Sequence, residues 1–219
     1  MSKQQTGQKK SYHHGDLKQA LLDETARILR EEGEEGLSLR RLAANLGVSR
    51  TAPYNHFKNK ESLLCAVAED GFARFNLAMR AARDKNRHSD GRALTRALVK
   101  AYVNFARRHQ EYYDLMYGSN AWRSGNPNES LATTARSTLR RDVERLERGQ
   151  QRGLIAKDVD VVQYAQMYWG TLHGISRLLL DGVYTDAASV KKLCEATADM
   201  LWLQLDPGQV KRRVPGKEQ

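Results

Sequence analysis

The side chains best suited to chemistry lie between residues 38 and 60, and the chemistry that they suit is the binding of a polyanion. This segment contains five Lys or Arg residues and no Asp or Glu. The whole chain has 219 residues and a formal net charge of +10, so half of the excess charge falls in one short segment. A solvated helix usually mixes both signs of charge, whereas a surface of one sign favours nucleic acid. The alternative is a basic helical hairpin without such a partner.

Some of these side chains are predicted to read base edges. Arg50 and Arg40 are of the type that donates two hydrogen bonds to guanine O6 and N7, and the amide of Asn55 suits adenine. Thr51 lies beside Arg50 at the same end of its helix. The other predicted DNA-binding residues are Ser38, Arg41, Ser49, Tyr54, His56, Lys58 and Lys60. Most of them suit phosphates, which set the register without reading sequence, although the two serines have helix capping alone as an alternative role.

Two short helices joined by a tight turn must position these side chains. The first helix has apolar residues at helical spacing, namely Leu39, Leu42, Ala43 and Leu46. Gly47 follows, at the point where the chain must leave a helix with a positive φ. We expect Ser49 to cap the second helix, which should run to about His56. Pro53 should shorten or tilt that helix because it lacks an N–H. The layout is typical of a helix-turn-helix, whose second helix enters the DNA major groove.

The segment that starts at Gly47, GVSRTAPYNHFKNKESL, resembles the helix-turn-helix signature of the TetR family of bacterial transcriptional regulators. The resemblance extends over residues 16–70. It implies an all-helical homodimer that binds a near-palindromic DNA operator, usually as a repressor, with a variable C-terminal domain for a small-molecule effector. Trp169, His173 and Gly174 also resemble one C-terminal subgroup of this family, the WHG type, whose members differ in ligand.

We therefore expect an all-α protein of about nine helices. Residues 1–15 should form a flexible basic arm, 16–60 an N-terminal three-helix helix-turn-helix domain, 61–206 a helical effector-binding and dimerisation domain, and 207–219 a basic tail. The arm either touches DNA or only aids solubility. We find no signal peptide or membrane-spanning stretch, and the two cysteines are far apart without a metal-ligand pattern. A cytoplasmic protein without cofactor, metal site or membrane partner is expected.

The last two long helices, predicted at residues 159–181 and 187–205, are expected to pair with those of a second copy. Gly170 and Gly174 lie four residues apart on one helix face. Each Gly inside a helix costs about 1 kcal/mol relative to Ala, and close approach of another helix is the best reason for two of them. Two helices from each copy would make a four-helix bundle across a two-fold axis.

A mixture of apolar, aromatic and a few polar side chains in the C-terminal part predicts a small-molecule pocket. The candidates are Phe75, Met79, Tyr102, Phe105, Tyr113, Met116, Trp122, Met167, Trp169 and His173. Plain core packing is the alternative for each of them. For His173 the alternative is a hydrogen-bonded histidine of the core or of a dimer interface.

Catalysis is not expected, because the chain lacks an HExxH, a GxSxG, a phosphate-binding Gly loop and a CxxC pair. Two classes of function remain. One is a regulator whose DNA binding is controlled by a small molecule, and the other is a ligand-independent DNA-architectural or interaction protein with the same helix-turn-helix.

Overall fold

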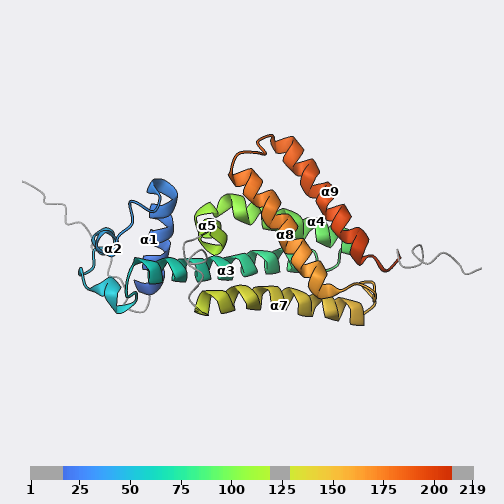
Figure 1. Ribbon diagram of the computed structural model, residues 1–219, viewed down its shortest axis with the longest axis horizontal. Helices are drawn as coiled ribbons and strands as arrows, with labels where there is room; N and C mark the ends of the chain where they lie inside the picture. Colours follow the sequence, from blue (N-terminus) through green and yellow to red (C-terminus); the bar gives the residue numbers. More distant parts are fainter. Residues whose placement is uncertain (1–16, 119–128, 209–219) are drawn as a thin grey trace, which may run out of the picture. The chain divides into compact units, whose positions relative to one another are not determined.

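The computed structural model describes residues 17–118 and 129–208, and within these ranges the protein is entirely helical (Figure 1). The described residues form eight α-helices and one short 3-10 helix, without a strand. This confirms the predicted all-α fold. The chain divides into two compact units, residues 1–67 and 68–219, and helix α3 (Lys60–Lys85) belongs to both. The predicted arm at residues 1–15 and nearly all of the predicted tail lie outside the described residues.

The first unit consists of α1 (Leu17–Glu32), α2 (Leu39–Asn45), the 3-10 helix η1 (Ala52–Asn55) and the beginning of α3. Its apolar core is built from residues spaced three or four apart on each helix. The most deeply buried of them are Leu21, Ile28, Leu42, Ala43, Phe57 and Leu63. Helix α1 ends where Gly33 takes a φ of +75°, a conformation that side chains with a Cβ rarely adopt.

The second unit contains the rest of α3 together with α4 (Gly91–Arg108), α5 (Gln110–Gly118), α7 (Glu129–Gln151), α8 (Val161–Leu180) and α9 (Ala187–Leu205). Three of these helices begin after an Asp whose carboxylate accepts hydrogen bonds from backbone N–H groups of the first turn: Asp90, Asp160 and Asp186. Helix α4 packs against α8 and α9, and α7 packs against α8. The helices thus surround one core.

Ion pairs fasten neighbouring helices of the second unit. The carboxylate of Asp199 on α9 accepts from Nε and Nη2 of both Arg92 and Arg96 on α4, at 2.7 to 2.9 Å. Hydrogen bonds from these two guanidinium groups hold the pKa of the Asp199 carboxyl well below its usual range. Between α3 and α7, Arg83 Nη2 donates to Asp142 Oδ1 at 2.9 Å. These pairs fix which helix faces meet.

No helix among the described residues is both long and apolar enough to cross a lipid bilayer. The two cysteines are free thiols, with Cys65 buried and Cys194 half-buried. Neither cysteine is therefore part of a disulfide.

Gly91 provides a test of how closely α4 and α9 pack. A Cβ at this position would lie 2.0 Å from Cη2 of Trp202 on α9. We expect Gly91→Ala to lower the free energy of unfolding by about 1–3 kcal/mol, because the rigid indole would have to move out of a packed site. Urea unfolding followed by circular dichroism measures the effect.

Gly118→Ala is the matched control for this prediction. A Cβ at Gly118 would meet no atom within 4 Å, so the stability should hardly change. Equal stability of the two variants would contradict the close packing of Gly91 against Trp202.

Candidate DNA-binding surface

The first helix of the predicted pair forms as expected. Ser38 has an extended backbone, and its Oγ accepts from the backbone N–H of Arg41 at 3.2 Å, which caps α2. Gly47 has a φ of +66° and lets the chain turn away after α2. The backbone N–H of Val48 donates to Ala43 O at 3.0 Å and closes that turn. The capping role predicted for Ser38 is therefore confirmed, and its contact with phosphate stays a prediction.

The second helix differs from the prediction of an α-helix that Ser49 caps. The segment forms only the 3-10 helix η1, with hydrogen bonds of 3.0 Å from Ala52 N to Ser49 O and from Tyr54 N to Thr51 O. Pro53 explains the difference, because it lacks the N–H that would make the first α-helical bond back to Ser49 O. The Ser49 Oγ lies 3.2 Å from Thr51 Oγ1 instead. The cap predicted for Ser49 is wrong.

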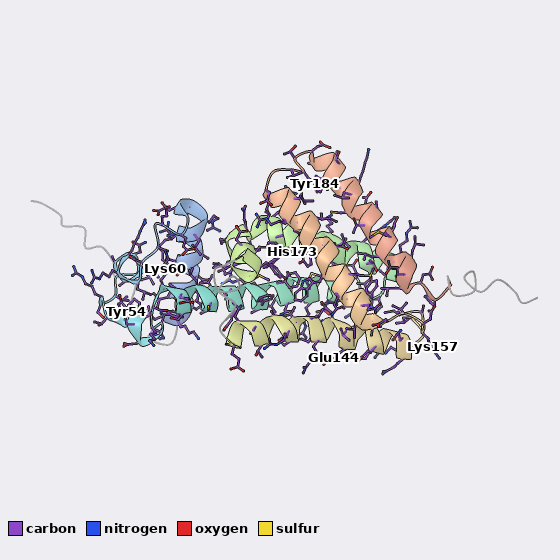
Figure 2. All side chains as sticks on the ribbon, viewed as in Figure 1. Tyr54, Lys60, Glu144, Lys157, His173 and Tyr184 are labelled. Atoms are coloured by element: carbon purple, nitrogen blue, oxygen red, sulfur yellow. The ribbon has the colours of Figure 1, made fainter. Side chains whose placement is uncertain are left out.

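The short helix nevertheless displays the predicted side chains to solvent. Pro53 and Phe57 are buried and anchor the segment to the core. Between and around these anchors the exposed residues are Arg40, Ser49, Arg50, Thr51, Tyr54, Asn55, His56 and Lys58. Figure 2 labels Tyr54 on η1 and Lys60 at the start of α3, both in the first unit. The structure thus gathers all of the predicted DNA-binding residues in this unit.

Two of the predicted DNA-binding cations are held inside the first unit. Arg41 Nη1 and Nη2 donate to the two carboxylate oxygens of Glu32 at 2.6 and 2.5 Å, and Nη1 also donates to Gly36 O at 3.0 Å. Lys60 Nζ donates to the backbone oxygen of Glu34 at 2.7 Å. The hydrogen bonds from Arg41 lower the pKa of Glu32. Arg41 and Lys60 therefore brace the unit, and their charges are already offset.

The other three cations of the segment are in a different position. Arg40, Arg50 and Lys58 are exposed, and the described part of the chain offers none of them an acidic partner. These residues are free to meet an anion without breaking an internal contact. Charge counting along the sequence treats all five cations alike, so it missed this division.

Sequence reasoning also missed the residues that support the segment. Asn59 Oδ1 accepts from the N–H of Ser62 at 2.8 Å, while the N–H of Asn59 donates to Ser62 Oγ at 3.1 Å. This reciprocal cap fixes where α3 begins. Asn45 Nδ2 donates to Glu24 Oε1 at 2.7 Å and joins α2 to α1. The three-residue spacing of Asn59 and Ser62 in the sequence was a signal from which the reciprocal cap could have been predicted.

The residues predicted to form the effector pocket divide into separate groups in the second unit. Phe75, Met79, Tyr102, Phe105, Tyr113 and Met116 are buried together. The ring of Phe75 meets those of Tyr102 and Phe105 edge to face, at centroid distances of 5.1 and 5.3 Å. Met167 is 48% exposed and does not belong to this core, because it lies on the outer face of α8. Trp122 lies outside the described residues.

The polar members of the predicted pocket meet at His173 of α8, which Figure 2 labels. Its Nδ1 lies 2.8 Å from the hydroxyl of Tyr113 on α5. Trp169 is half-buried and contacts Tyr117, whose ring sequence reasoning did not single out, at a centroid distance of 6.1 Å. His173 is thus hydrogen-bonded at the edge of the core.

Two family models match this chain. The model of "Bacterial regulatory proteins, tetR family" matches residues 21–67, and "Tetracyclin repressor-like, C-terminal domain" matches residues 95–201, which include Trp169, His173 and Gly174. The chain belongs to the TetR family of regulators. The resemblance stated from the sequence is therefore confirmed.

Individual TetR-family relatives agree with this assignment. The chain is 48% identical over 52 residues to the tetracycline repressor protein class C of Escherichia coli, a match that covers 24% of each chain. A Rhodococcus sp. RHA1 protein of unknown function has a similar structure, with a TM-score of 0.75, 34% identity and coverage of 90% of this chain and 99% of that one. A regulatory protein of the tetR family from Rhodococcus RHA1 shares the fold, with a TM-score of 0.62, 20% identity and coverage of 87% and 97%. The match to the curated repressor thus spans about a quarter of its length.

Arg40 and Arg41 are adjacent in the TetR-type head but should respond differently to substitution. On a duplex of arbitrary sequence, where Arg40 has no matching base and can only meet phosphate, we expect Arg40→Ala to reduce the slope of log affinity against log salt by about 0.9, the value for one lost phosphate contact. Arg41→Ala should leave that slope unchanged and lower the urea midpoint, because it breaks the pair with Glu32. Fluorescence anisotropy with a duplex of arbitrary sequence measures the slopes. Equal changes of slope would contradict the division of the cations.

Proposed function

We propose that this protein is a homodimeric, sequence-specific DNA-binding repressor in the cytoplasm, which leaves a palindromic operator when a small molecule binds its second unit. The observation that carries this proposal is the segment from Ser38 to Lys60, which has no acidic residue and leaves Arg40, Arg50 and Lys58 exposed. The relative from Escherichia coli bears the name of a repressor, which supports repression as the outcome. The action is binding and not catalysis.

The exposed residues of the first unit suit two kinds of DNA contact. Arg50 and Thr51 immediately precede η1 and are placed to meet base edges, with Arg40 and Asn55 as further readers. Lys58 and Tyr54 suit phosphates, which would fix the register of the protein on the duplex. Because η1 is a single short turn, few side chains can reach the bases, and the phosphate contacts carry much of the affinity.

The outer face of α8 and α9 supports a dimer. Met167, Gly170, Gly174 and Leu178 follow one another at helical spacing on α8, and Met167 and Leu178 are exposed although apolar. Met200 and Leu203 are exposed on α9. A Cβ added at Gly170 or Gly174 would meet no atom of residues 17–118 or 129–208 within 4 Å. The two glycines are therefore not required by packing inside the chain, and a second copy gives them a reason.

A dimer would present two copies of the first unit to the DNA. The operator should then be a near-palindrome with half-sites about 34 Å apart, one turn of the duplex. An effector can release the operator only if it binds one arrangement of the two first units more tightly than the other. Helix α3 is shared by both units and is the element through which such a difference would pass.

The alternative is a ligand-independent DNA-architectural protein with the same head. Three buried hydroxyl groups of the second unit, those of Tyr117, Tyr168 and Ser176, find no hydrogen-bond partner among the described residues. An architectural protein has no use for such groups, because plain core packing would stabilise it better. This observation favours the ligand-controlled regulator.

Selection from random duplexes tests the DNA-binding proposal directly. We expect the protein to enrich a near-palindromic site, and the double variant Arg50→Ala, Tyr54→Ala to enrich none while it keeps its helical circular dichroism. Lys100→Ala removes an exposed cation from α4 and is the control, which should recover the parent site. Unchanged enrichment by the double variant would refute the assignment of the surface.

Substitution of Gly170 tests the dimer. We expect Gly170→Arg to keep or raise the stability of the single chain, since the position is open and Gly costs about 1 kcal/mol in a helix. The bulky cation should however block the second copy, so that sedimentation equilibrium shows a monomer where the parent is a dimer. Gly118→Arg, at another open position, should leave the dimer intact. A dimeric Gly170→Arg variant would show that the copies meet elsewhere.

A further inference from the structure

A group of hydroxyls and one imidazole lies inside the second unit, where α4, α5 and α8 come together. The hydroxyl of Tyr113 is 3.3 Å from that of Tyr102 and 2.8 Å from Nδ1 of His173. The ring of Tyr117 contacts the rings of Tyr113 and His173 at centroid distances of 4.9 and 4.8 Å. Ser176 follows His173 by three residues and so shares its helix face. We call these five residues the hydroxyl cluster.

Two atoms of the hydroxyl cluster, the hydroxyls of Tyr117 and Ser176, are shielded from solvent and have no hydrogen-bond partner in the part of the chain that the structure describes. Ser176 is 0% exposed. Each lies close enough to a partnered hydroxyl to affect its pKa, Tyr117 to that of Tyr102 and Ser176 to that of Tyr113, but neither contact has the geometry of a full hydrogen bond. A buried hydroxyl without a partner costs free energy, so each one calls for an explanation such as an ordered water or a ligand. Two such groups in one cluster indicate a place for a molecule that can hydrogen-bond to them.

The hydroxyl cluster is uncharged at neutral pH. Burial raises the pKa of Tyr113 to about 12 and raises the pKa values of Tyr102 and Tyr117 as well, so the phenols stay protonated. Burial lowers the pKa of His173, and the nearby Arg177 lowers it further, so the imidazole is neutral. The cluster can therefore donate and accept hydrogen bonds, but it has no charge with which to balance an ion.

The nearest described ion pair offers no free charge either. Arg177 lies one turn beyond His173, and its Nη1 and Nη2 donate to Asp114 Oδ1 and Asp181 Oδ1 at 2.6 Å each. One cation is thus shared between two carboxylates, which leaves a net charge of −1. An anionic ligand would meet repulsion here, and a cationic one would find both carboxylates already hydrogen-bonded by Arg177.

We propose that the effector is an uncharged molecule, with an apolar body and a hydroxyl or carbonyl group that binds the hydroxyl cluster through Tyr117 and Ser176. This inference rests on the proposed function. The apolar body would lie against the aromatic core of Phe75, Tyr102 and Phe105. Tyr117, Trp169 and His173 are only half-buried, so the cluster is one layer of side chains from solvent. An ion placed there would lose its hydration without gaining a counter-charge.

Probes that share one ring system test the preference for an uncharged ligand. The full-length protein is titrated with 2-naphthol, 2-naphthaldehyde, 2-naphthoate and 2-naphthylmethylammonium, and binding is measured by calorimetry and by the shift of the melting temperature. We expect at least one neutral probe to bind at least tenfold more tightly than either charged probe. Equal or tighter binding of a charged probe, or no binding of either neutral probe, would overturn the proposal.

Conservative variants test whether the hydroxyl cluster is the place of binding. Tyr117→Phe and Ser176→Ala remove the two hydroxyls that lack a partner, so the melting temperature without ligand should stay the same or rise. The affinity for the neutral probe should fall at least tenfold. Tyr168→Phe is the matched control, since it also removes a buried hydroxyl without a partner but lies outside the cluster. Lower stability of the first two variants with unchanged probe affinity would mean that the hydroxyls hold ordered water only, and would overturn the assignment.

Operator affinity separates this inference from the proposed function. Without ligand, the variants of the hydroxyl cluster should bind the selected operator as the parent does. If a neutral probe binds the cluster but leaves operator affinity unchanged, the ligand class stands and effector-driven release fails. If a charged molecule binds tightly and releases the operator, release stands and the uncharged class is wrong.

Discussion

A division of charge in the first unit is the constraint on which DNA binding and local folding both depend. Five cations in a short segment repel one another unless some are paired. Glu32, the last residue of α1, pairs with Arg41, and Glu34, in the turn that follows, pairs with Lys60; together they hold α2 and the start of α3 in place. The remaining cations then face solvent, where they gain most from a polyanion that releases its counterions. The acidic turn thus allows the basic segment to be both folded and available.

Proline sets the shape of the surface that carries this charge. The missing N–H of Pro53 prevents a regular α-helix, yet its buried ring and that of Phe57 fasten the segment to the core. A short turn anchored at two points can display side chains without a long apolar stripe of its own. Under the proposed function, specificity comes from few base contacts, so the geometry around Arg50 and Thr51 would matter more than it would on a longer recognition helix.

Much of the fold could be predicted from the sequence, because helical spacing and Asp caps are local signals. The helices that follow Asp160 and Asp186 begin within two residues of the expected places. The division of the cations could not be predicted, since it depends on which carboxylate each guanidinium or ammonium group reaches across the chain. The place of Met167 could not be predicted either. Its apolar side chain suits a pocket, but it lies on a face of α8 that is exposed to solvent. The partly exposed Tyr117 has no sequence signal that separates it from its neighbours on α5.

The second unit differs from the first in how it treats polar groups. In the first unit the ions that support the fold are paired near the surface, where pairing costs little desolvation. In the second unit, three buried hydroxyls have no hydrogen-bond partner among the described residues, and two of them belong to the hydroxyl cluster. A ligand can bias a regulator only through a difference in affinity between two states. Hydroxyls that gain partners from a ligand provide such a difference when only one arrangement of the helices brings them to the ligand. An interior that already satisfied every polar group would bind the same molecule more weakly and would have less to transmit.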